Sequence, residues 1–379
     1  TITYQPDTVE YTVNYYFETA VGVYPEGPNQ KVTGNGTIGE EIPYTTDIET
    51  APGKPMTGNY VFDYVTNRGG TVTDNPNQNV VNVYFALDET GEHDGIPDKY
   101  QVTVVYHVEN GYWADDDSAD RSYLLTLKTR DSEDAEWTDA DPAPSMNVPA
   151  ADTMKPVAGY TKQDDPWSVA VAPNVTSTPE ADPNNVAASA LQGGHTYTYT
   201  YTYVPRTDLH YTVKFVKLDD HSVELAKAYM SPESLAYKSE VTLGNIPDTV
   251  RNKQIAGYKY HSASIDNAPL TISHDDSQNV VYLYYKANSY TVTYKVDGEV
   301  IGTPENVEYN TEVTVAEKYE KTGYTVTDWT TSDATIENGK FTMPAQDVVI
   351  EATTSINKYT VTYKVDGEVI GTPENVEYN

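Results

Sequence analysis

Short segments in which apolar and polar side chains alternate recur along the chain. Tyr11–Phe17 and Gln101–Val108 are two of them. A third, Tyr197–Val204, would place tyrosines on one strand face and threonines on the other. A period of two residues predicts a half-buried β-strand. Because no stretch of convincing length has the helical period, we predict a mainly all-β fold.

One segment of the chain is present twice. Tyr290–Asn310 reads YTVTYKVDGEVIGTPENVEYN, and Tyr359–Asn379 repeats it letter for letter at an offset of 69 residues (290 to 359). Such self-similarity is typical of a tandem repeat array. Since the second copy has only begun at Asn379, we expect the chain to be an internal fragment of a longer protein.

Turn-rich stretches separate the predicted strands into successive modules. We expect tandem, small β-sandwich or β-grasp-like modules in an extended array, which would form a monomeric rod. The predicted segments are a β module (1–87), an acidic linker (88–99), a larger β module (100–205), a β module (206–287), a repeat module (288–358) and the start of the next repeat (359–379).

Two dipeptides that end in glycine mark turns within the repeat module. Asp297-Gly298 is a type I′ hairpin signal, and Asn338-Gly339 marks a second hairpin. We expect the second one to join a strand at Ala334–Ile336 to a strand at Lys340–Met343.

The stretch Gly34–Gly39 matches GxGxxG, but its surroundings argue against a dinucleotide site. That fingerprint needs a helix after it, whose N-terminus holds the pyrophosphate. Here Glu40, Glu41 and Pro43 follow, and they would repel phosphate and interrupt a helix. We therefore expect a glycine-rich turn between strands.

Composition narrows the classes of partner. The chain has 24 Lys and Arg against 57 Asp and Glu, a net charge of −33, which argues against binding nucleic acid or anionic lipid. No run of apolar residues is long enough for membrane insertion. The absence of Cys excludes disulfides and thiolate chemistry. The excess of Tyr (34) over Phe (5) suits thin sheets whose surfaces are only half-buried.

An acidic loop lies between the first two modules. Asp94–Asp98 (DGIPD) resembles the calcium-binding interdomain linkers of bacterial surface proteins, in which several oxygens surround a glycine-bent loop. Thr90 and Glu92 occupy two positions where that pattern has Asp, and Asp88 could compensate. The candidate structural calcium ligands are therefore Asp88, Glu92, Asp94 and Asp98. The alternative is a solvated acidic linker with no cofactor.

Three tryptophans, Trp113, Trp137 and Trp167, fall in the larger module among Asp- and Pro-rich loops. Exposed indole rings stack on sugars, so these residues are candidates for glycan binding. The alternative is that they are core residues, as tryptophans in small β domains usually are.

The sequence offers no pattern that predicts catalysis. The seven His form no HExxH spacing, and neither GxSxG nor SxxK occurs. Repeat arrays also lack the deep concave site that catalysis requires. We therefore predict that the chain is not an enzyme.

Two family resemblances follow from these segments. The third module has Tyr211–Val216 (YTVKFV), Gly257-Tyr258 and Asn279–Tyr285 (NVVYLYY). It resembles the mucin-binding-protein (MucBP) repeat of Gram-positive surface proteins. The first module has Asn79–Phe85 (NVVNVYF) and Gly58-Asn59-Tyr60 and is similar to the same family.

The repeat module has TGYTVTDW at 322–329 and FTMPAQDVVIEA at 341–352. It resembles the internalin B-repeat (Listeria–Bacteroides repeat) family. That resemblance implies a β-grasp-like fold in a surface-anchored protein.

Together the resemblances imply an extracellular, cell-wall-associated region of a Gram-positive multidomain surface protein. We expect an adhesin that binds host or mucus glycoprotein or glycan, with recognition between residues 100 and 286. The alternatives are a passive stalk of spacer repeats and an accessory region of a secreted enzyme. Cys-free surface domains of this kind can also carry Lys–Asn isopeptide bonds beside a buried carboxylate, and the composition leaves that chemistry open.

Overall fold

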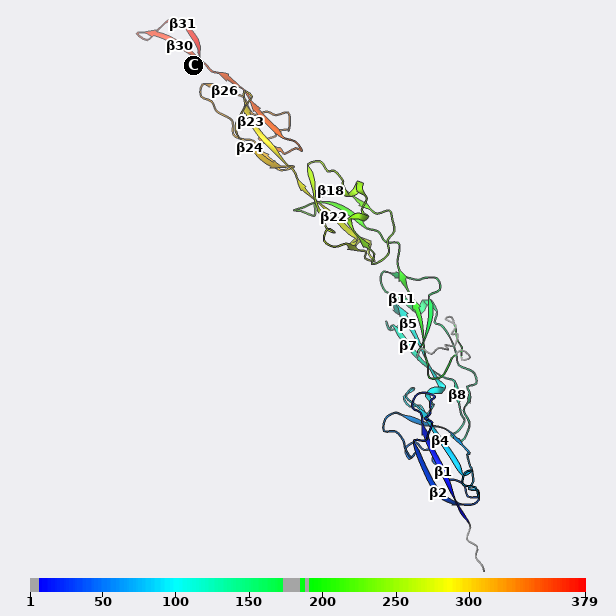
Figure 1. Ribbon diagram of the computed structural model, residues 1–379. Coiled ribbons are helices and arrows are strands. Elements are labelled where there is room, and N and C mark those ends of the chain that lie inside the picture. Colours follow the sequence, from blue (N-terminus) through cyan, green and yellow to red (C-terminus); the bar gives the residue numbers. More distant parts are fainter. Residues whose placement is uncertain (1–6, 173–184, 188–190) are drawn as a thin grey trace, which may run out of the picture. The chain divides into compact units, whose positions relative to one another are not determined.

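The computed structural model describes residues 7–172, 185–187 and 191–379, and these residues are almost entirely strands and connecting turns (Figure 1). Among them the only α-helix is the four-residue α1 (Asp248–Arg251). The chain divides into two compact units, Thr1–Pro205 and Arg206–Asn379. The prediction of an all-β protein built from small successive sheets is confirmed.

The first sheet has the strand order β2-β1-β4-β3. Its strands are β1 (Thr8–Phe17), β2 (Gln30–Thr37), β3 (Tyr60–Thr66) and β4 (Val80–Leu87). The two central strands, β1 and β4, are parallel, and each has an antiparallel outer neighbour. The predicted alternation buries one face of each central strand: Val13, Tyr15, Phe17, Val81, Val83 and Phe85.

Asn79 fixes the chain just before β4. Its side chain is fully buried, and its Nδ2 donates to the carbonyl oxygens of Glu10 (3.1 Å) and Thr73 (3.0 Å). Its Oδ1 accepts hydrogen bonds from the amide and the hydroxyl of Thr73, both at 2.8 Å. All the hydrogen-bonding positions of the carboxamide are therefore used, as burial requires.

The stretch Gly34–Gly39 differs from the expected turn. Gly34 and Gly36 lie within β2, and only the residues after Thr37 turn. Gly34 pairs with Tyr11, and a Cβ on Gly34 would lie 2.3 Å from the Tyr11 hydroxyl oxygen. The glycine is therefore needed because the tyrosine ring crosses the strand at that point.

The second sheet has the order β13-β15-β5-β7, with β5 and β15 as its parallel central pair. Its strands are β5 (Gln101–Glu109), β7 (Asp120–Thr126), β13 (Trp167–Ala172) and β15 (Thr196–Thr202). Tyr197, Tyr199 and Tyr201 of β15 are buried, as the alternation predicts. Short pairs and turns surround this sheet: β6 (Gly111–Trp113) with β11 (Met154–Pro156), β8 (Lys128–Thr129) with β9 (Thr138–Asp139), β10 (Ser145–Asn147) with β14 (Asn185–Ala187), β12 (Tyr160–Thr161) with β16 (Val204–Pro205), η1 (Asp98–Tyr100) and η2 (Ala151–Thr153).

The second unit begins with a third sheet of the same plan, in the order β18-β17-β22-β20. Its strands are β17 (Thr212–Lys217), β18 (Glu224–Met230), β20 (Tyr258–Ala263) and β22 (Val280–Ala287), and β17 is parallel to β22. Smaller elements lie between them: β19 (Glu240–Val241) with β21 (Leu270–Thr271), η4 (Leu243–Asn245) and η5 (Asp276–Gln278).

Asn279 holds the third sheet as Asn79 holds the first. Its buried Nδ2 donates to the carbonyl oxygens of His210 and Ser273, both at 3.1 Å. Its Oδ1 accepts from the amide of Ser273 at 2.8 Å. Two sheets with different surface residues thus share one strand order and one buried asparagine.

The duplicated sequence opens a fourth sheet, in the order β24-β23-β28. Its strands are β23 (Ser289–Val296), β24 (Glu299–Glu308) and β28 (Val348–Ala352). Asp297 and Gly298 have φ of 53° and 88°, the two positive values that a type I′ turn requires. Two short pairs complete this part: β25 (Glu312–Thr314) with β27 (Lys340–Thr342), and β26 (Tyr324–Val326) with β29 (Thr354–Ile356).

The second predicted hairpin is only partly correct. Asn338 and Gly339 turn the chain with positive φ, and Glu337 bridges Lys340. Ala334–Ile336 does not form a strand, however, and β27 pairs with β25 instead. Ala334 and Ile336 pack against the core through their side chains, and no ladder of backbone bonds holds them.

The second copy of the duplicated sequence forms the same hairpin. β30 (Lys358–Val365) pairs with β31 (Glu368–Glu377) in the register of β23 with β24. Val292 is buried, whereas its counterpart Val361 is exposed. Since the same hairpin forms in both surroundings, its register is encoded locally.

Candidate functional site

A recurring contact joins each repeat of the second unit to the segment before it. The amide of Asn288 donates to the carbonyl oxygen of Gly257 at 2.9 Å, and the amide of Tyr309 donates to the carbonyl oxygen of Asn288 at 2.8 Å. The Tyr309 ring then lies against Gly257 and meets the Tyr258 ring edge to face, with centroids 5.3 Å apart. We name this arrangement the glycine–tyrosine joint.

A second glycine–tyrosine joint uses the next copy of the repeat. The amide of Asn357 donates to Gly323 O, and the amide of Tyr378 donates to Asn357 O, both at 2.9 Å. Asn357 and Tyr378 are the counterparts of Asn288 and Tyr309 at the 69-residue offset (288 to 357 and 309 to 378). The contact therefore recurs with the repeat.

Each joint needs glycine for two reasons. Gly257 and Gly323 have φ of +78° and +81°, a conformation that favours glycine. An added Cβ would also lie 2.3 Å from the Tyr309 ring and 2.0 Å from the Tyr378 ring, respectively. The Gly-Tyr dipeptide that supports the MucBP resemblance thus has a physical role, because its glycine receives the tyrosine of the following repeat.

The three candidate tryptophans do not converge on one surface. Trp113 is 1% exposed and lies in the core of the second sheet, with the Arg121 guanidinium over its ring. Trp137 is half-buried, and its Nε1 donates to the carbonyl oxygen of Asp63 at 3.1 Å. Trp167 opens β13 and is half-buried against Tyr201. Trp113 offers no ring face to a sugar, and stacking on a glycan stays a prediction for the other two.

The carboxylates of the acidic loop bond to the loop itself. Asp98 accepts hydrogen bonds from the amide (3.0 Å) and the hydroxyl (2.7 Å) of Thr90. Asp88 Oδ2 accepts from the Gly95 amide at 3.1 Å, and Asp94 Oδ1 accepts from the Ile96 amide at 3.0 Å.

The fourth candidate calcium ligand, Glu92, is exposed. Among the described residues, no three His, Cys, Asp or Glu side chains are placed so that they could hold a metal ion. The four carboxylates do not fit a calcium ion as arranged, and binding would require the loop to rearrange. Occupancy by calcium therefore stays a prediction.

Asp88 provides a test of how this loop is stabilised. Burial raises the pKa of Asp88, as do the neighbouring carboxylates of Asp94 and Asp98 to a smaller extent, and its Oδ1 is buried with no hydrogen-bond partner. Because the folded state holds the Asp88 proton more tightly than the unfolded state, this group's contribution falls as the pH rises from about 4 towards neutral.

We expect Asp88→Asn to raise the free energy of unfolding by about 1 kcal/mol at pH 7 in EDTA, and by less at pH 4. Thermal denaturation at both pH values measures the difference. Asp131→Asn, at an exposed carboxylate, is the control. An Asp88→Asn variant that is less stable at pH 7 in EDTA would contradict this account of the loop.

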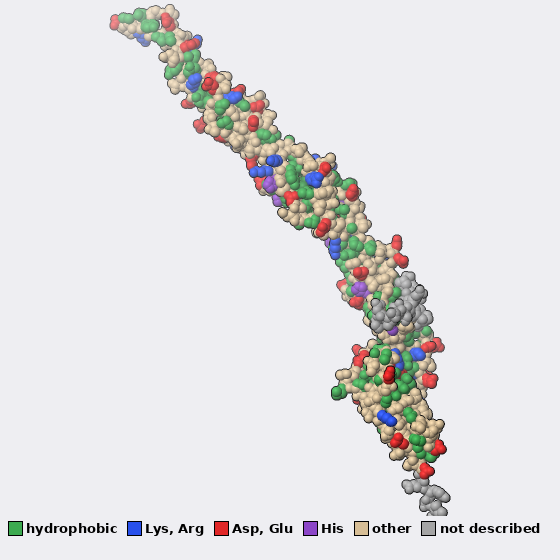
Figure 2. All heavy atoms as spheres, viewed as in Figure 1, with side chains coloured by type: hydrophobic (Ala, Val, Ile, Leu, Met, Phe, Trp, Pro, Cys, Tyr) green, Lys and Arg blue, Asp and Glu red, His purple; other side chains and the backbone are tan. Residues whose placement is uncertain are grey.

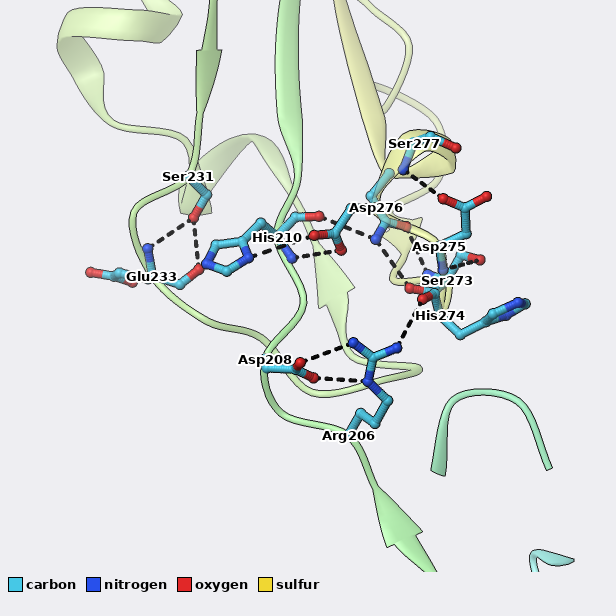
Figure 3. Close-up of polar contacts among 11 residues, drawn as sticks. Arg206, Asp208, His210, Ser231, Glu233, Ser273, His274, Asp275, Asp276 and Ser277 are labelled. Carbon is cyan, nitrogen blue, oxygen red and sulfur yellow. Dashed lines mark hydrogen bonds and ion pairs between the residues drawn. The ribbon is translucent and has the colours of Figure 1, made fainter. Parts of the chain in front are cut away.

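A polar cluster holds the start of the second unit (Figure 3). Arg206 donates to both carboxylate oxygens of Asp208 at 2.9 Å, and this bidentate pair lowers the pKa of Asp208. The amide of His210 donates to Asp276 Oδ1 at 3.0 Å, and its ring Nδ1 lies 3.6 Å from Asp276 Oδ2. Ser231 donates its hydroxyl hydrogen to the Glu233 carbonyl oxygen. Because that bond directs the hydroxyl to a backbone oxygen, the cluster lacks the arrangement of a serine nucleophile and its base.

A hollow beside α1 has a composition that is unusual for this acidic chain. It has a volume of about 620 Å³ and contains no Asp or Glu. Three cationic side chains line it, Arg251, Lys253 and Lys259, together with tyrosine rings. Figure 2 shows Asp and Glu side chains spread widely over the face in view. We name this hollow the cationic pocket. Its three cationic side chains lie within one short segment, residues 251–259, and sequence reasoning missed them because this segment matches no recognised motif.

These features define a class of protein, a tandem array of small all-β repeats in which glycine–tyrosine joints connect successive repeats. Residues 290–353 match the Listeria–Bacteroides repeat domain, and this match confirms that part of the sequence-based resemblance. The resemblance of the first and third sheets to MucBP repeats stays a prediction.

Two solved structures show weak similarity. The pilus adhesin SpaC of Lactobacillus rhamnosus GG, in an open conformation, is 8% identical, and the alignment covers 68% of this chain and 43% of that chain, with a TM-score of 0.15. The chain therefore spans less than half the length of that adhesin. Two B repeat units of the collagen-binding protein of Staphylococcus aureus are 10% identical, with 93% of this chain and 100% of that chain covered and a TM-score of 0.15. TM-scores this low carry no argument about function.

The one α-helix in the described part of the chain, α1, is far too short to span a bilayer.

Proposed function

We propose that this chain is a non-catalytic spacer region of an extracellular, cell-wall-associated surface protein of a Gram-positive-type bacterium. The observation that carries the proposal is the glycine–tyrosine joint and its recurrence at Gly257 and Gly323. A passive connection between modules needs only a flexible linker. A joint made of two backbone hydrogen bonds and a ring seated on glycine instead restricts how one repeat can move on the next.

The charge of the chain supports the same function. A net charge of −33 keeps successive repeats soluble and discourages association between copies. A repeat array also stabilises each small unit through its neighbours, which matters for modules whose own cores are thin. The core around Val292, for example, has few fully buried side chains.

Small-angle X-ray scattering on lengthened chains tests the spacer function. Insertion of one, two or three further copies of residues 290–358 should increase the maximum dimension by a constant step for each copy, because docked repeats add equal lengths. A maximum dimension that grows with the square root of the number of copies would indicate flexible links and would contradict the proposal.

A second function, adhesion, is favoured by the cationic pocket. Its lysine and arginine side chains suit the carboxylate or sulfate groups of acidic mucus glycans, and its tyrosine rings suit sugar faces. Arg251 is held by an ion pair with Asp248 and by the Leu243 carbonyl oxygen, to which it donates at 3.3 Å. Lys253 lies over the Phe215 ring. The ligand class proposed here is a sialylated or sulfated glycan of a host or mucus glycoprotein.

We expect the double variant Lys253→Gln/Lys259→Gln to bind sulfated mucin-type oligosaccharide about tenfold more weakly than the unmodified chain, because two charge-assisted contacts are lost. A glycan array followed by calorimetry would measure it. Lys227→Gln, at an exposed lysine of β18 outside the pocket, is the matched control and should bind normally. No binding by the unmodified, folded chain would exclude adhesion through this pocket and leave the spacer function standing.

A further inference from the structure

The connection between the first two sheets is built differently from the glycine–tyrosine joints. The amide of Asp88 donates to Asn59 O at 3.0 Å, as Asn288 does to Gly257 O. A charged cluster lies at this connection. It consists of Glu18, which follows β1, Asp63 of β3 and Lys99 of η1.

The cluster brings an amine against two fully buried carboxylates. The side chains of Glu18 and Asp63 have 0% exposure, and that of Lys99 has 16%. Lys99 Nζ contacts Asp63 Oδ2 and lies 3.0 Å from Glu18 Oε1. Glu18 Oε2 accepts a hydrogen bond from the Leu87 amide at 3.1 Å, which fixes its carboxylate.

The surroundings of the cluster are aromatic. Lys99 Nζ lies 4.8 Å from the centroid of the Tyr24 ring and 5.3 Å from that of the Tyr100 ring. The Tyr24 hydroxyl donates to Asp63 Oδ2 at 2.7 Å, and the Tyr100 hydroxyl donates to Asp63 Oδ1 at 3.2 Å. Burial, together with the charge of Asp63, raises the pKa of both tyrosines, so both remain hydrogen-bond donors to Asp63 at neutral pH.

The fold itself does not require these acids. Asp63 is the extra residue at a β-bulge, since the pairing of β3 with β4 shifts between Phe62 and Tyr64. The third sheet has the same shift at His261 and the same backbone bond after its first strand, from Leu218. His261 and Leu218 of the third sheet thus occupy the positions that Asp63 and Glu18 occupy in the first sheet. Both sheets form nevertheless. Two buried carboxylates around one amine leave a net negative charge, and the desolvation of that charge costs free energy.

We propose that Lys99 and Asp63 condense into an amide bond that ties η1 to β3, with Glu18 as the base. The Nζ–Cγ bond forms and the bond from Cγ to one carboxylate oxygen breaks. Glu18 takes a proton from the Lys99 ammonium and passes it to the departing Asp63 oxygen. Nζ loses a second proton to the same oxygen, which then leaves as water. The ammonium and the carboxylate become one neutral amide and one water, and Glu18 ends as it began. The two tyrosine hydroxyls stabilise the charge that develops on the Asp63 oxygens.

The intact mass of the purified, folded chain tests the proposal. We expect a mass lower than the sequence mass by one water, and tandem mass spectrometry should identify a branched peptide that joins the segments containing Lys99 and Asp63. Lys99→Arg keeps the positive charge without a condensing amine and should have the full sequence mass. Lys54→Arg, at a lysine paired with exposed Glu49, should retain the loss of water.

Two further variants separate this bond from other dehydrations. Asp63→Asn should lose one ammonia in place of one water, because the leaving group is then the amide nitrogen. Glu18→Gln, which keeps the shape of the side chain but cannot take the proton, should retain the full mass while circular dichroism shows the native β signal. A folded, unmodified chain at its full sequence mass would overturn the proposal, and so would a loss of water that persists in Lys99→Arg.

Discussion

Replacing Gly257 with Val is expected to open the glycine–tyrosine joint and to cost about 3 kcal/mol, from positive-φ strain and from overpacking against the ring. The added Cβ would lie 2.3 Å from the Tyr309 ring, which has to leave its position. The backbone hydrogen bonds of Asn288 and Tyr309 should then weaken together, since they hold the same contact. Amide hydrogen exchange on the full chain measures this directly, with faster exchange expected at Asn288 and Tyr309.

The matched control is Gly302→Val. Gly302 has a φ of +70°, close to that of Gly257, but no atom lies within 4 Å of its ideal Cβ position. It therefore reports backbone strain without the ring contact. A second variant, Gly257→Val with Tyr309→Ala, should recover part of the lost stability because the clash is removed. Equal effects of the two valine substitutions on exchange at Asn288 would show that the ring contact carries no stabilisation.

Replacing Asn279 with Ala is expected to destabilise the third sheet by about 3 kcal/mol. The side chain is fully buried and satisfies the carbonyl oxygens of His210 and Ser273 and the amide of Ser273. Alanine would leave these partly buried groups without the partner that Asn279 provides, and each such loss is costly. Urea denaturation of the full chain should show one transition moved to lower concentration while the transition of the first sheet stays in place.

Asn77→Ala is the control for the asparagine prediction. Asn77 is exposed and lies in the loop before β4, which corresponds to the loop before β22 that contains Asn279. Asn79→Ala should move the first sheet's transition instead. If Asn279→Ala and Asn77→Ala shift the denaturation curve equally, the buried amide has no special role in the fold.

Local patterns in the sequence predicted the strands well. The alternation in Tyr197–Val204 gave β15 and its buried tyrosine face, since burial on one side imposes a period of two. Asp297-Gly298 predicted its hairpin because a two-residue turn with both φ positive selects these residue types. Residues 290–353 also match the repeat family that their spelling suggested.

Partners that are distant in the sequence could not be predicted in this way. The pairing of β27 with β25, in place of Ala334–Ile336, depends on packing across the sheet. Gly34 has its role only because Tyr11 crosses β2 there. The Glu18, Asp63 and Lys99 cluster comes from three separate segments and depends on a β-bulge, which no short motif announces.

The tryptophans illustrate a related limit. The sequence allowed two interpretations of the three tryptophans, stacking on a sugar and packing in a core, and tryptophans in small β domains usually pack in a core. The structure places Trp113 in a core, 1% exposed, because β6 pairs with β11 over the end of the second sheet. Whether an aromatic side chain faces water is decided by such short pairings, and their sequences are too brief to be recognised in advance.

The central claim is that successive repeats are held by built joints, and a distance measurement across the first joint of the second unit tests it most directly. Because the chain has no Cys, Met230→Cys and Val300→Cys would give a unique pair of spin labels at exposed sites on β18 and β24. Double electron–electron resonance should give one narrow distance distribution in this chain and a broad distribution once Tyr309→Ala is added. A distribution equally broad with and without Tyr309 would contradict the account.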